Sequence, residues 1–376
     1  MGSRRIPVVI LAGFLGSGKT TLLNHLLRRS RGTRIGAIVN DFGSIEIDAM
    51  TVAGQVDSMV SLGDGCLCCA VDTSDMDEVL EVLARPSAGM DVIVIEASGV
   101  AEPETLIRMI LASESPHITY GGLVEVVDAA EFTAVRERHP ELDRHVAAAD
   151  LLVLNKADRA EPGPLRALRA TLEELSPGTP VVEASYGRVD PELLFDRTRR
   201  ERADVEQLSF DMLLYDEEEA GDGHEGHLHA SYEVVEFRAK EPLDPRRFLD
   251  FLDTRPAGLY RMKGIVDFGP ADPARKYAMH AVGGFLRFTP MEWERGEARG
   301  SQVVMIGSGL DGDALRAGAD ACVADGSAGA DAGAGTGADA DAGADERAMW
   351  GVLRYVEADP EAAGEDGVEV EEPDLV

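Results

Sequence analysis

Cysteine is scarce in this sequence, and the few cysteines present are clustered. Of the four, Cys66, Cys68 and Cys69 lie within four positions, while Cys322 is remote from them. A disulfide framework needs more cysteines spread along the chain, so this pattern excludes a disulfide-rich scaffold. Metal binding or thiol chemistry is the better interpretation of the cluster, and we expect Cys322 to be a packed thiol.

Basic residues are also few. The chain has 36 lysines and arginines against 69 aspartates and glutamates, which gives a formal net charge of -33. A nucleic-acid partner needs a positive field to attract its phosphates, so we expect no nucleic acid to bind. After Arg354 the chain carries nine acidic residues and no basic one, which is typical of a solvated disordered tail.

Long apolar runs are absent as well. No stretch of the sequence approaches the roughly twenty apolar residues of a membrane-spanning helix. The first residues, MGSRRIPVVILAGF, lead directly into a glycine-rich motif instead of ending in the small-residue cleavage site of a secretory signal. We therefore expect a cytoplasmic protein with no membrane partner. Its 376 residues, 44% of them hydrophobic, allow two domains with sizeable cores.

The first two hundred residues alternate short apolar runs with helical patterns. Buried strands of a parallel sheet are nearly continuous in apolar residues, because both of their faces are covered. This pattern predicts an α/β domain over residues 1–200 with a doubly wound parallel sheet, whose ligands bind at the carboxyl ends of the strands. The predicted strands are Pro7–Ala12, Arg34–Asn40, Asp91–Glu96, Gly122–Asp128 and Asp150–Asn155.

The rest of the chain divides into four parts by composition. Residues 201–230 form a polar, acidic, histidine-containing linker. The pattern of residues 231–324 predicts a smaller α+β domain, with strands at 232–238, 260–268 and 301–306 and a helix that begins near Asp244. Residues 325–345 contain only Ala, Gly, Asp, Ser and Thr and cannot form a core. Residues 346–376 contain a short apolar piece, Met349–Val356, expected as an edge strand, and the acidic tail.

A phosphate-binding loop follows the first predicted strand. Gly13-Phe-Leu-Gly-Ser-Gly-Lys-Thr20 matches this motif and opens a predicted helix, as the mechanism requires. Gly13, Gly16, Ser17 and Gly18 would turn backbone N–H groups onto the phosphates, and the helix N-terminus, with Thr20 and Thr21, would add its positive end. Lys19 should reach the β- and γ-phosphates, and Thr20 should bind Mg²⁺. The alternative is a chance glycine-rich turn.

A guanine-reading signature follows the fifth predicted strand. Asn155-Lys156-Ala157-Asp158 matches the Asn-Lys-x-Asp pattern of G proteins. The carboxylate of Asp158 can accept hydrogen bonds from N1–H and the exocyclic amine of guanine, a pair that adenine does not offer. Together with the upstream phosphate loop, the pattern favours GTP over ATP and disfavours an ATP-dependent enzyme.

Three further residues are candidates for magnesium and γ-phosphate contacts. Glu96 ends a hydrophobic strand, where its carboxylate could hold the magnesium shell through water, and Gly99 could offer its backbone N–H to the γ-phosphate. Asp41, after the second strand, could position Mg²⁺ or water. The alternatives are an ordinary acid at a strand end for Glu96 and a solvated loop acid for Asp41.

The cysteine cluster has the composition of a metal site. Three thiolates at roughly 2.3 Å would suit Zn²⁺ and leave a fourth tetrahedral position open, which favours transfer of the metal over a structural role. Three buried small hydrophobes, or a redox pair of thiols, are the alternatives for Cys66, Cys68 and Cys69. His224, His227 and His229 form a looser cluster in the linker, either a second metal site or part of a solvated segment.

The ordered motifs resemble the CobW family, relatives of the HypB and UreG metal-insertion GTPases. GFLGSGKTTLLNHLL, VNDFGSIEID, GDGCLCC, DVIVIEASGVAEP and LNKAD carry the resemblance over roughly residues 6 to 190. YRMKGIVDF, at Tyr260–Phe268, is similar to the C-terminal domain of the family. Two features depart from the family pattern: Ser44 stands where a glutamate is usual, and segment 325–345 is atypical.

The resemblance implies a function. Members of this family hydrolyse GTP and deliver zinc, or sometimes Co²⁺ or Fe²⁺, to client metalloproteins, and Cys66, Cys68 and Cys69 match their Cys-x-Cys-Cys metal motif. We therefore expect a GTPase that uses GTP, Mg²⁺ and Zn²⁺, has a client metalloprotein as its partner, and can form a homo-oligomer. A cobalt-dedicated GTPase of cobalamin biosynthesis and a zinc-storage or regulatory binding protein are the alternatives.

Overall fold

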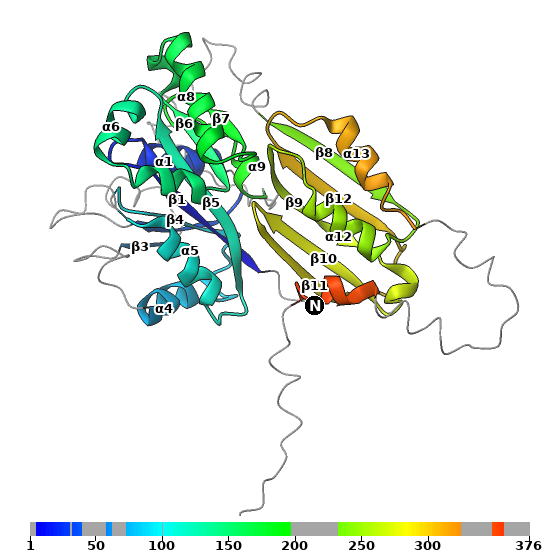
Figure 1. Ribbon diagram of the computed structural model, residues 1–376. Helices are drawn as coiled ribbons and strands as arrows, with labels where there is room; N and C mark the ends of the chain where they lie inside the picture. The colour runs from blue at the N-terminus through cyan, green and yellow to red at the C-terminus, as the bar shows by residue number, and fades with distance from the viewer. Residues whose placement is uncertain are drawn as a thin grey trace, which may run out of the picture.

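Two sheets organise the residues described by the computed structural model, namely residues 5–30, 32–39, 58–61, 73–99, 101–196, 232–324 and 348–356. The first sheet, with helices on its faces, forms one unit, and the second sheet stands beside it with α12 and α13 lying across it (Figure 1). The predicted linker 201–230 and segment 325–345 lie outside the described residues, so the domain boundaries remain predictions.

The first sheet is parallel throughout. Its order is β3-β2-β4-β1-β5-β6-β7, and every neighbouring pair is parallel. β2, β4 and β6 are buried at every residue, which explains why their sequences show no polar alternation. The strands are β1 (Ile6–Ala12), β2 (Ile35–Val39), β3 (Ser58–Ser61), β4 (Val92–Glu96), β5 (Ile118–Asp128), β6 (Leu151–Asn155) and β7 (Val181–Glu183).

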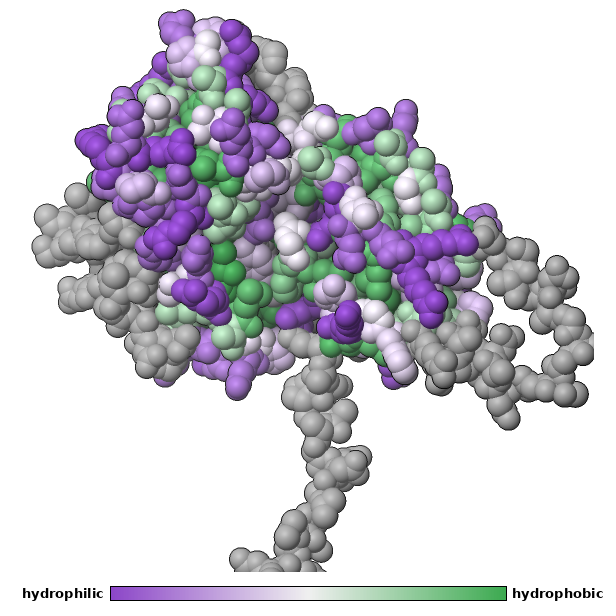
Figure 2. Space-filling view, viewed as in Figure 1, coloured by the Kyte–Doolittle hydropathy of each residue, from purple (hydrophilic) through white to green (hydrophobic). Residues whose placement is uncertain are grey.

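Helices cover both faces of this sheet, as predicted for a doubly wound fold. Val9 and Leu11 of β1 pack in one cluster with the leucines of α1, whereas Val8 and Ile10 pack in another with residues of α4 and α5. Hydrophilic residues gather on the outer surface over α6 and α8 (Figure 2). The helices are α1 (Lys19–Arg29), α4 (Thr73–Ala84), α5 (Pro103–Ala112), α6 (Phe132–Arg138), α7 (Leu142–Ala148), α8 (Pro162–Leu175) and α9 (Pro191–Leu194), with the 3-10 turn η1 (Ala157–Arg159).

The second sheet is antiparallel, in the order β11-β10-β9-β12-β8. An aromatic cluster that includes Phe248, Phe268 and Phe288 fills its core. In the part of the chain described, no helix of either unit is long and apolar enough to cross a membrane. The elements are β8 (Glu233–Ala239), α12 (Pro245–Asp253), β9 (Leu259–Val266), η3 (Gly269–Ala271), β10 (Arg275–Val282), β11 (Phe285–Glu292), β12 (Ser301–Gly307) and α13 (Gly312–Asp320).

Three predicted strands and the helix of this unit are confirmed, and one prediction is wrong. Asp244 caps α12, because its carboxylate accepts hydrogen bonds from the backbone N–H groups of Arg246 and Arg247. The apolar piece near the end is not an edge strand: residues 348–353 are helical, and only Val356 forms an isolated bridge, to Phe288. Met349 and Val352 are both buried, and a spacing of three suits one helix face.

The two units share a polar and apolar interface. Arg261, on β9, donates to the carbonyl of Leu194 at 3.1 Å and to the carboxylate of Asp196 at 2.6 Å. His280 Nε2, on β10, donates to the carbonyl of Tyr120 on β5 at 2.9 Å. Burial lowers the pKa of His280 to about 4, so this imidazole is neutral and its contact is an ordinary hydrogen bond. The second unit is therefore docked on β5, whose other end lies at the phosphate loop.

A substitution at Gly122 on β5 tests whether the second unit packs on this strand. The φ of this glycine is +108°, and a Cβ atom there would lie 2.6 Å from Val282 Cγ1 and 2.9 Å from the Tyr260 hydroxyl, both in the second unit. We expect Gly122→Ala to lower the free energy of unfolding by about 2 kcal/mol or more, through backbone strain and this clash. Urea unfolding followed by circular dichroism measures the change.

Gly163→Ala is the matched control, since Gly163 lies in α8 and a Cβ atom there meets nothing within 4 Å. Alanine is the better helix former, so this control should raise stability by up to about 1 kcal/mol. Equal unfolding midpoints for the two variants would contradict the docking described.

Candidate functional site

The phosphate loop lies between β1 and α1 and depends on its glycines. Gly13, Gly16 and Gly18 have φ values of +140°, +79° and +104°, a region that favours glycine. A Cβ atom on Gly13 would lie 2.4 Å from the carbonyl oxygen of Val126, and one on Gly18 would lie 2.3 Å from Asn155 Nδ2. The loop therefore packs so tightly on β5 and β6 that side chains at these two positions are excluded.

Lys19 is held within the curve of the loop. Its side chain is buried, and Nζ donates to the carbonyl oxygens of Gly13 at 2.8 Å and Phe14 at 3.3 Å. The backbone of α1 begins at this lysine, so the ammonium group and the positive end of the helix act at the same place. Thr20 and Thr21 follow on the first turn. This arrangement suits an anion such as a phosphate group.

Thr20 and Glu96 meet at the carboxyl edge of the sheet. The Thr20 hydroxyl donates to Glu96 Oε1 at 2.5 Å, across 76 residues of sequence. A hydroxyl and a carboxylate oxygen beside a phosphate loop are hard donors of the kind that Mg²⁺ prefers, so these residues fit the ion. Gly99 lies against the loop: a Cβ atom on it would be 2.8 Å from both N and Cα of Leu15.

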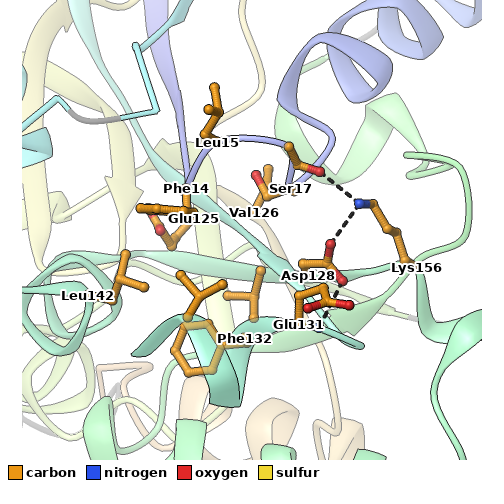
Figure 3. A pocket seen from close by; sticks show the side chains of 13 residues that line it. Phe14, Leu15, Ser17, Glu125, Val126, Asp128, Glu131, Phe132, Leu142 and Lys156 are labelled. Atoms are coloured by element: carbon orange, nitrogen blue, oxygen red, sulfur yellow. Dashed lines mark hydrogen bonds and ion pairs between the residues drawn. The ribbon is translucent and has the colours of Figure 1, made fainter. Parts of the chain in front are cut away.

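The Asn155–Asp158 segment is tied to the loop by side chains. Asn155 Nδ2 donates to the carbonyl oxygen of Ser17 at 2.9 Å, which fixes this segment relative to the loop. Lys156 Nζ donates to the carbonyl oxygen of Gly16 at 2.8 Å and forms an ion pair of 2.6 Å with Asp128 (Figure 3). Asp158 is exposed on η1, where its carboxylate is open to a ligand.

Sequence reasoning missed Asp128 and Gly187, which support this segment. Asp128 ends β5 and orients Lys156, and the signal available was a polar residue at the carboxyl end of a predicted strand. Gly187, after β7, donates its backbone N–H to Asn155 Oδ1 at 2.9 Å. A Cβ atom on Gly187 would lie 2.7 Å from the backbone N of Leu22, so this turn also packs on α1.

The remaining predicted site residues lie outside the described residues. They are Asp41, Cys66, Cys68, Cys69, His224, His227 and His229. Within the described ranges, no group of three or more metal-ligating side chains is present. The buried thiol expected at Cys322 is confirmed; burial raises its pKa to about 11, which does not suit a reactive thiolate. The metal-binding predictions therefore remain predictions.

A phosphate loop after the central strand, joined by hydrogen bonds to an Asn-Lys-Ala-Asp segment after β6, defines this protein as a P-loop GTPase. The model of the CobW/HypB/UreG nucleotide-binding domain matches residues 7–183, and that of the cobalamin synthesis protein cobW C-terminal domain matches residues 232–323. The chain belongs to the CobW family.

Its relatives include two proteins named "Zinc chaperone CobW". The one from Sinorhizobium sp is 31% identical over 356 residues, which is 85% of this chain and 98% of the relative. The one from Pseudomonas aeruginosa is 30% identical over 352 residues, with 83% and 90% covered. The "Zinc-regulated GTPase metalloprotein activator 1" of Schizosaccharomyces pombe is 31% identical over 194 residues, with 49% and 47% covered.

The exposed carboxylate of Asp158 makes base recognition testable. Asp158→Asn replaces one of the two acceptors for guanine by a donor, so we expect GDP affinity to fall by about tenfold to a hundredfold. Xanthine presents a carbonyl where guanine has its amine, so the variant should bind XDP better than wild type does. Titration of each protein with GDP and with XDP measures this change in nucleotide preference. An unchanged preference for GDP would show that Asp158 does not read the base.

Proposed function

We propose that this chain is a metallochaperone that hydrolyses GTP, binds Zn²⁺ through Cys66, Cys68 and Cys69, and delivers the ion to a client metalloprotein. The observation that carries the proposal is the register of the parallel sheet. It brings the end of β3, the strand that precedes the cysteines, to the same edge of the sheet as the phosphate loop and Glu96. The phosphate loop and Glu96 belong to the site of a GTPase whose relatives are named zinc chaperones.

The register can be followed across four strands. Ser61, the last residue of β3, pairs with Val39 of β2; Val39 pairs with Glu96 of β4; and Glu96 pairs with Leu11 of β1. Neighbouring strands are about 4.8 Å apart, so Ser61 is about 10 Å from Glu96. Cys66 follows Ser61 by five residues, a span of at most about 18 Å. This separation along the chain allows a metal on the cysteines to lie near the magnesium and γ-phosphate positions, and we propose that it does.

The described residues supply most of what GTP hydrolysis requires. The backbone of the phosphate loop and Lys19 would hold the β- and γ-phosphates, and Thr20 with Glu96 would hold Mg²⁺, which neutralises charge that develops on the phosphates. Gly99, beside Leu15, would offer its N–H to the γ-phosphate. Asp41 follows the last residue of β2 by two positions in the sequence, and in this proposal it positions the water or the ion.

The metal chemistry follows from three thiols on one short segment. Three thiolates leave one tetrahedral position of Zn²⁺ open, so a client ligand can enter before the ion leaves. His224, His227 and His229 would serve as a second, weaker set of ligands in the linker. Co²⁺ and Fe²⁺ accept similar ligands, so a cobalt-dedicated GTPase of cobalamin biosynthesis is the second candidate, and competition between the metals separates the two.

Coupling between the two sites would make the transfer directional. If GTP and Zn²⁺ bias one another, hydrolysis changes the metal site, and the coupling must be reciprocal, typically about 1–3 kcal/mol. We therefore expect stoichiometric Zn²⁺ to change the rate or the Michaelis constant of steady-state GTP hydrolysis by the full-length protein. The change should vanish when Cys66, Cys68 and Cys69 are all replaced by serine.

Cys322→Ser is the matched control for this experiment. The Cys322 thiol is buried in the second unit, so this variant should retain the response to zinc. A hydrolysis rate that ignores zinc in a protein that still binds it would leave two unconnected sites. The protein would then be a zinc-storage or regulatory binding protein with a GTPase fold, and the proposal would be wrong.

A further inference from the structure

The turn that follows β7 has an unusual residue at its corner. It runs from Ser185 to Arg188 and is closed by a hydrogen bond of 3.1 Å from Arg188 N to the carbonyl oxygen of Ser185. Its two central residues, Tyr186 and Gly187, have φ values of +55° and +67°. Positive φ at both central positions defines a type I′ turn, in which asparagine or aspartate followed by glycine is the usual pair. Tyrosine is an exception at the first of these positions.

The strained backbone of Tyr186 has a counterpart in the base-reading segment. In the part of the chain that the structure describes, Lys156, with a φ of +58°, and Tyr186 are the two residues other than glycine with positive φ. Bulky side chains are disfavoured in this conformation, and such strain persists where the surrounding structure enforces it, often at functional sites. Lys156 belongs to the Asn155–Asp158 segment, so the place of Tyr186 relative to that segment is informative.

The turn lies directly beside the base-reading segment. β6 and β7 are parallel neighbours, so the segments that follow them leave the sheet at the same edge (Figure 1). Ala157 N donates to the carbonyl oxygen of Ala184 at 3.1 Å, and Gly187 N donates to Asn155 Oδ1 at 2.9 Å. These two hydrogen bonds hold the turn against the segment that contains Asp158.

The same turn packs on the first turn of α1. A Cβ atom on Gly187 would lie 2.7 Å from N of Leu22 and 3.0 Å from C of Thr21. The turn is thus wedged between α1, whose N-terminus suits the phosphates, and the segment with Asp158, which would read the base. A bound nucleotide spans those two places, so its base lies next to the turn.

Burial does not explain why a tyrosine occupies this strained position. Its side chain is 61% exposed, whereas Ala184 and Gly187 of the same turn are buried. The guanidinium carbon of Arg188 lies 5.9 Å from the centroid of the ring, a cation–π distance that restrains the ring beside the turn. A flat, exposed and restrained ring at the base position is a platform on which a purine can stack.

We propose that the ring of Tyr186 stacks on the guanine base of the bound nucleotide, while Asp158 accepts hydrogen bonds from the edge of that base. Stacking on an aromatic ring depends little on the identity of the base, because every base has a π-face. Tyr186 therefore contributes affinity, and Asp158 contributes selectivity. The proposal rests on the GTPase site alone and involves none of the predicted metal ligands.

Tyr186→Asn separates the ring from the turn. Asparagine suits the first central position of a type I′ turn, so the variant should unfold in urea at the wild-type midpoint or above it. Loss of the stacked ring should weaken GDP binding by about fivefold to a hundredfold. Isothermal titration calorimetry with the full-length protein and Mg²⁺ measures the affinity. Tyr186→Gly, which accepts the same φ, should show the same loss and gives a second variant of the fold without the ring.

Two controls show whether the loss belongs to the ring. Tyr186→Phe keeps the ring and should bind GDP within about twofold of wild type. Tyr355→Asn removes a partly exposed tyrosine of the second unit and should leave GDP affinity unchanged. A folded Tyr186→Asn or Tyr186→Gly protein that binds GDP as tightly as wild type would overturn the proposal.

Ligand comparisons distinguish stacking from a change in the phosphate loop. Inorganic pyrophosphate with Mg²⁺ has no base, so Tyr186→Asn should bind it as wild type does. The ratio of GDP to XDP affinity should also stay unchanged in this variant, because both bases stack alike. An equal loss of affinity for GDP and pyrophosphate would overturn the proposal, since the phosphate contacts would then be the part affected.

A fluorescent variant reports the contact itself. Tyr186→Trp keeps an aromatic ring at the turn, and GDP should quench the fluorescence of the added indole by stacking on it, whereas pyrophosphate should not. The wild-type protein, which has two tryptophans elsewhere, provides the background signal. A Tyr186→Trp protein that binds GDP without any quenching beyond this background would contradict the stacking.

Discussion

The parallel alignment of the first sheet is the constraint on which the rest of the site depends. Because its strands run in one direction, the phosphate loop, Glu96 and the Asn155–Asp158 segment all follow carboxyl ends at one edge. The strand order and the register of the backbone pairs set the positions of these segments along the edge. Residues separated by 76 positions, such as Thr20 and Glu96, then meet within 2.5 Å.

Side-chain bridges refine what the sheet brings together. Asn155 links the phosphate loop to the turn after β7, and Lys156 links the loop to the end of β5. The segment that would read the base therefore also fixes the position of the phosphate loop. The second unit docks on the opposite half of β5, so one strand contacts both the interface and the loop.

Much of this was predictable from local patterns. The apolar runs predicted the positions of the central strands. The glycine-rich loop and the Asn-Lys-Ala-Asp segment were recognisable because their chemistry requires particular residues at a fixed spacing. β10 was missed because Ala278 and His280 interrupt its apolar pattern, and β11 because Pro290 is unfavourable within a strand. Met349–Val356 was misassigned because a short apolar run suits either a strand or a buried helix face. The Asp128–Lys156 pair is a tertiary contact that no single segment specifies.

In the proposed function, metal and nucleotide act on one another across the sheet edge. The most direct measurement is the Zn²⁺ dissociation constant of the full-length protein, by competition with a chromophoric chelator, once with GDP bound and once with a non-hydrolysable GTP analogue. We expect the two constants to differ by about fivefold to 150-fold. Equal constants would show that hydrolysis has no means of releasing the ion, and the proposed coupling would be wrong.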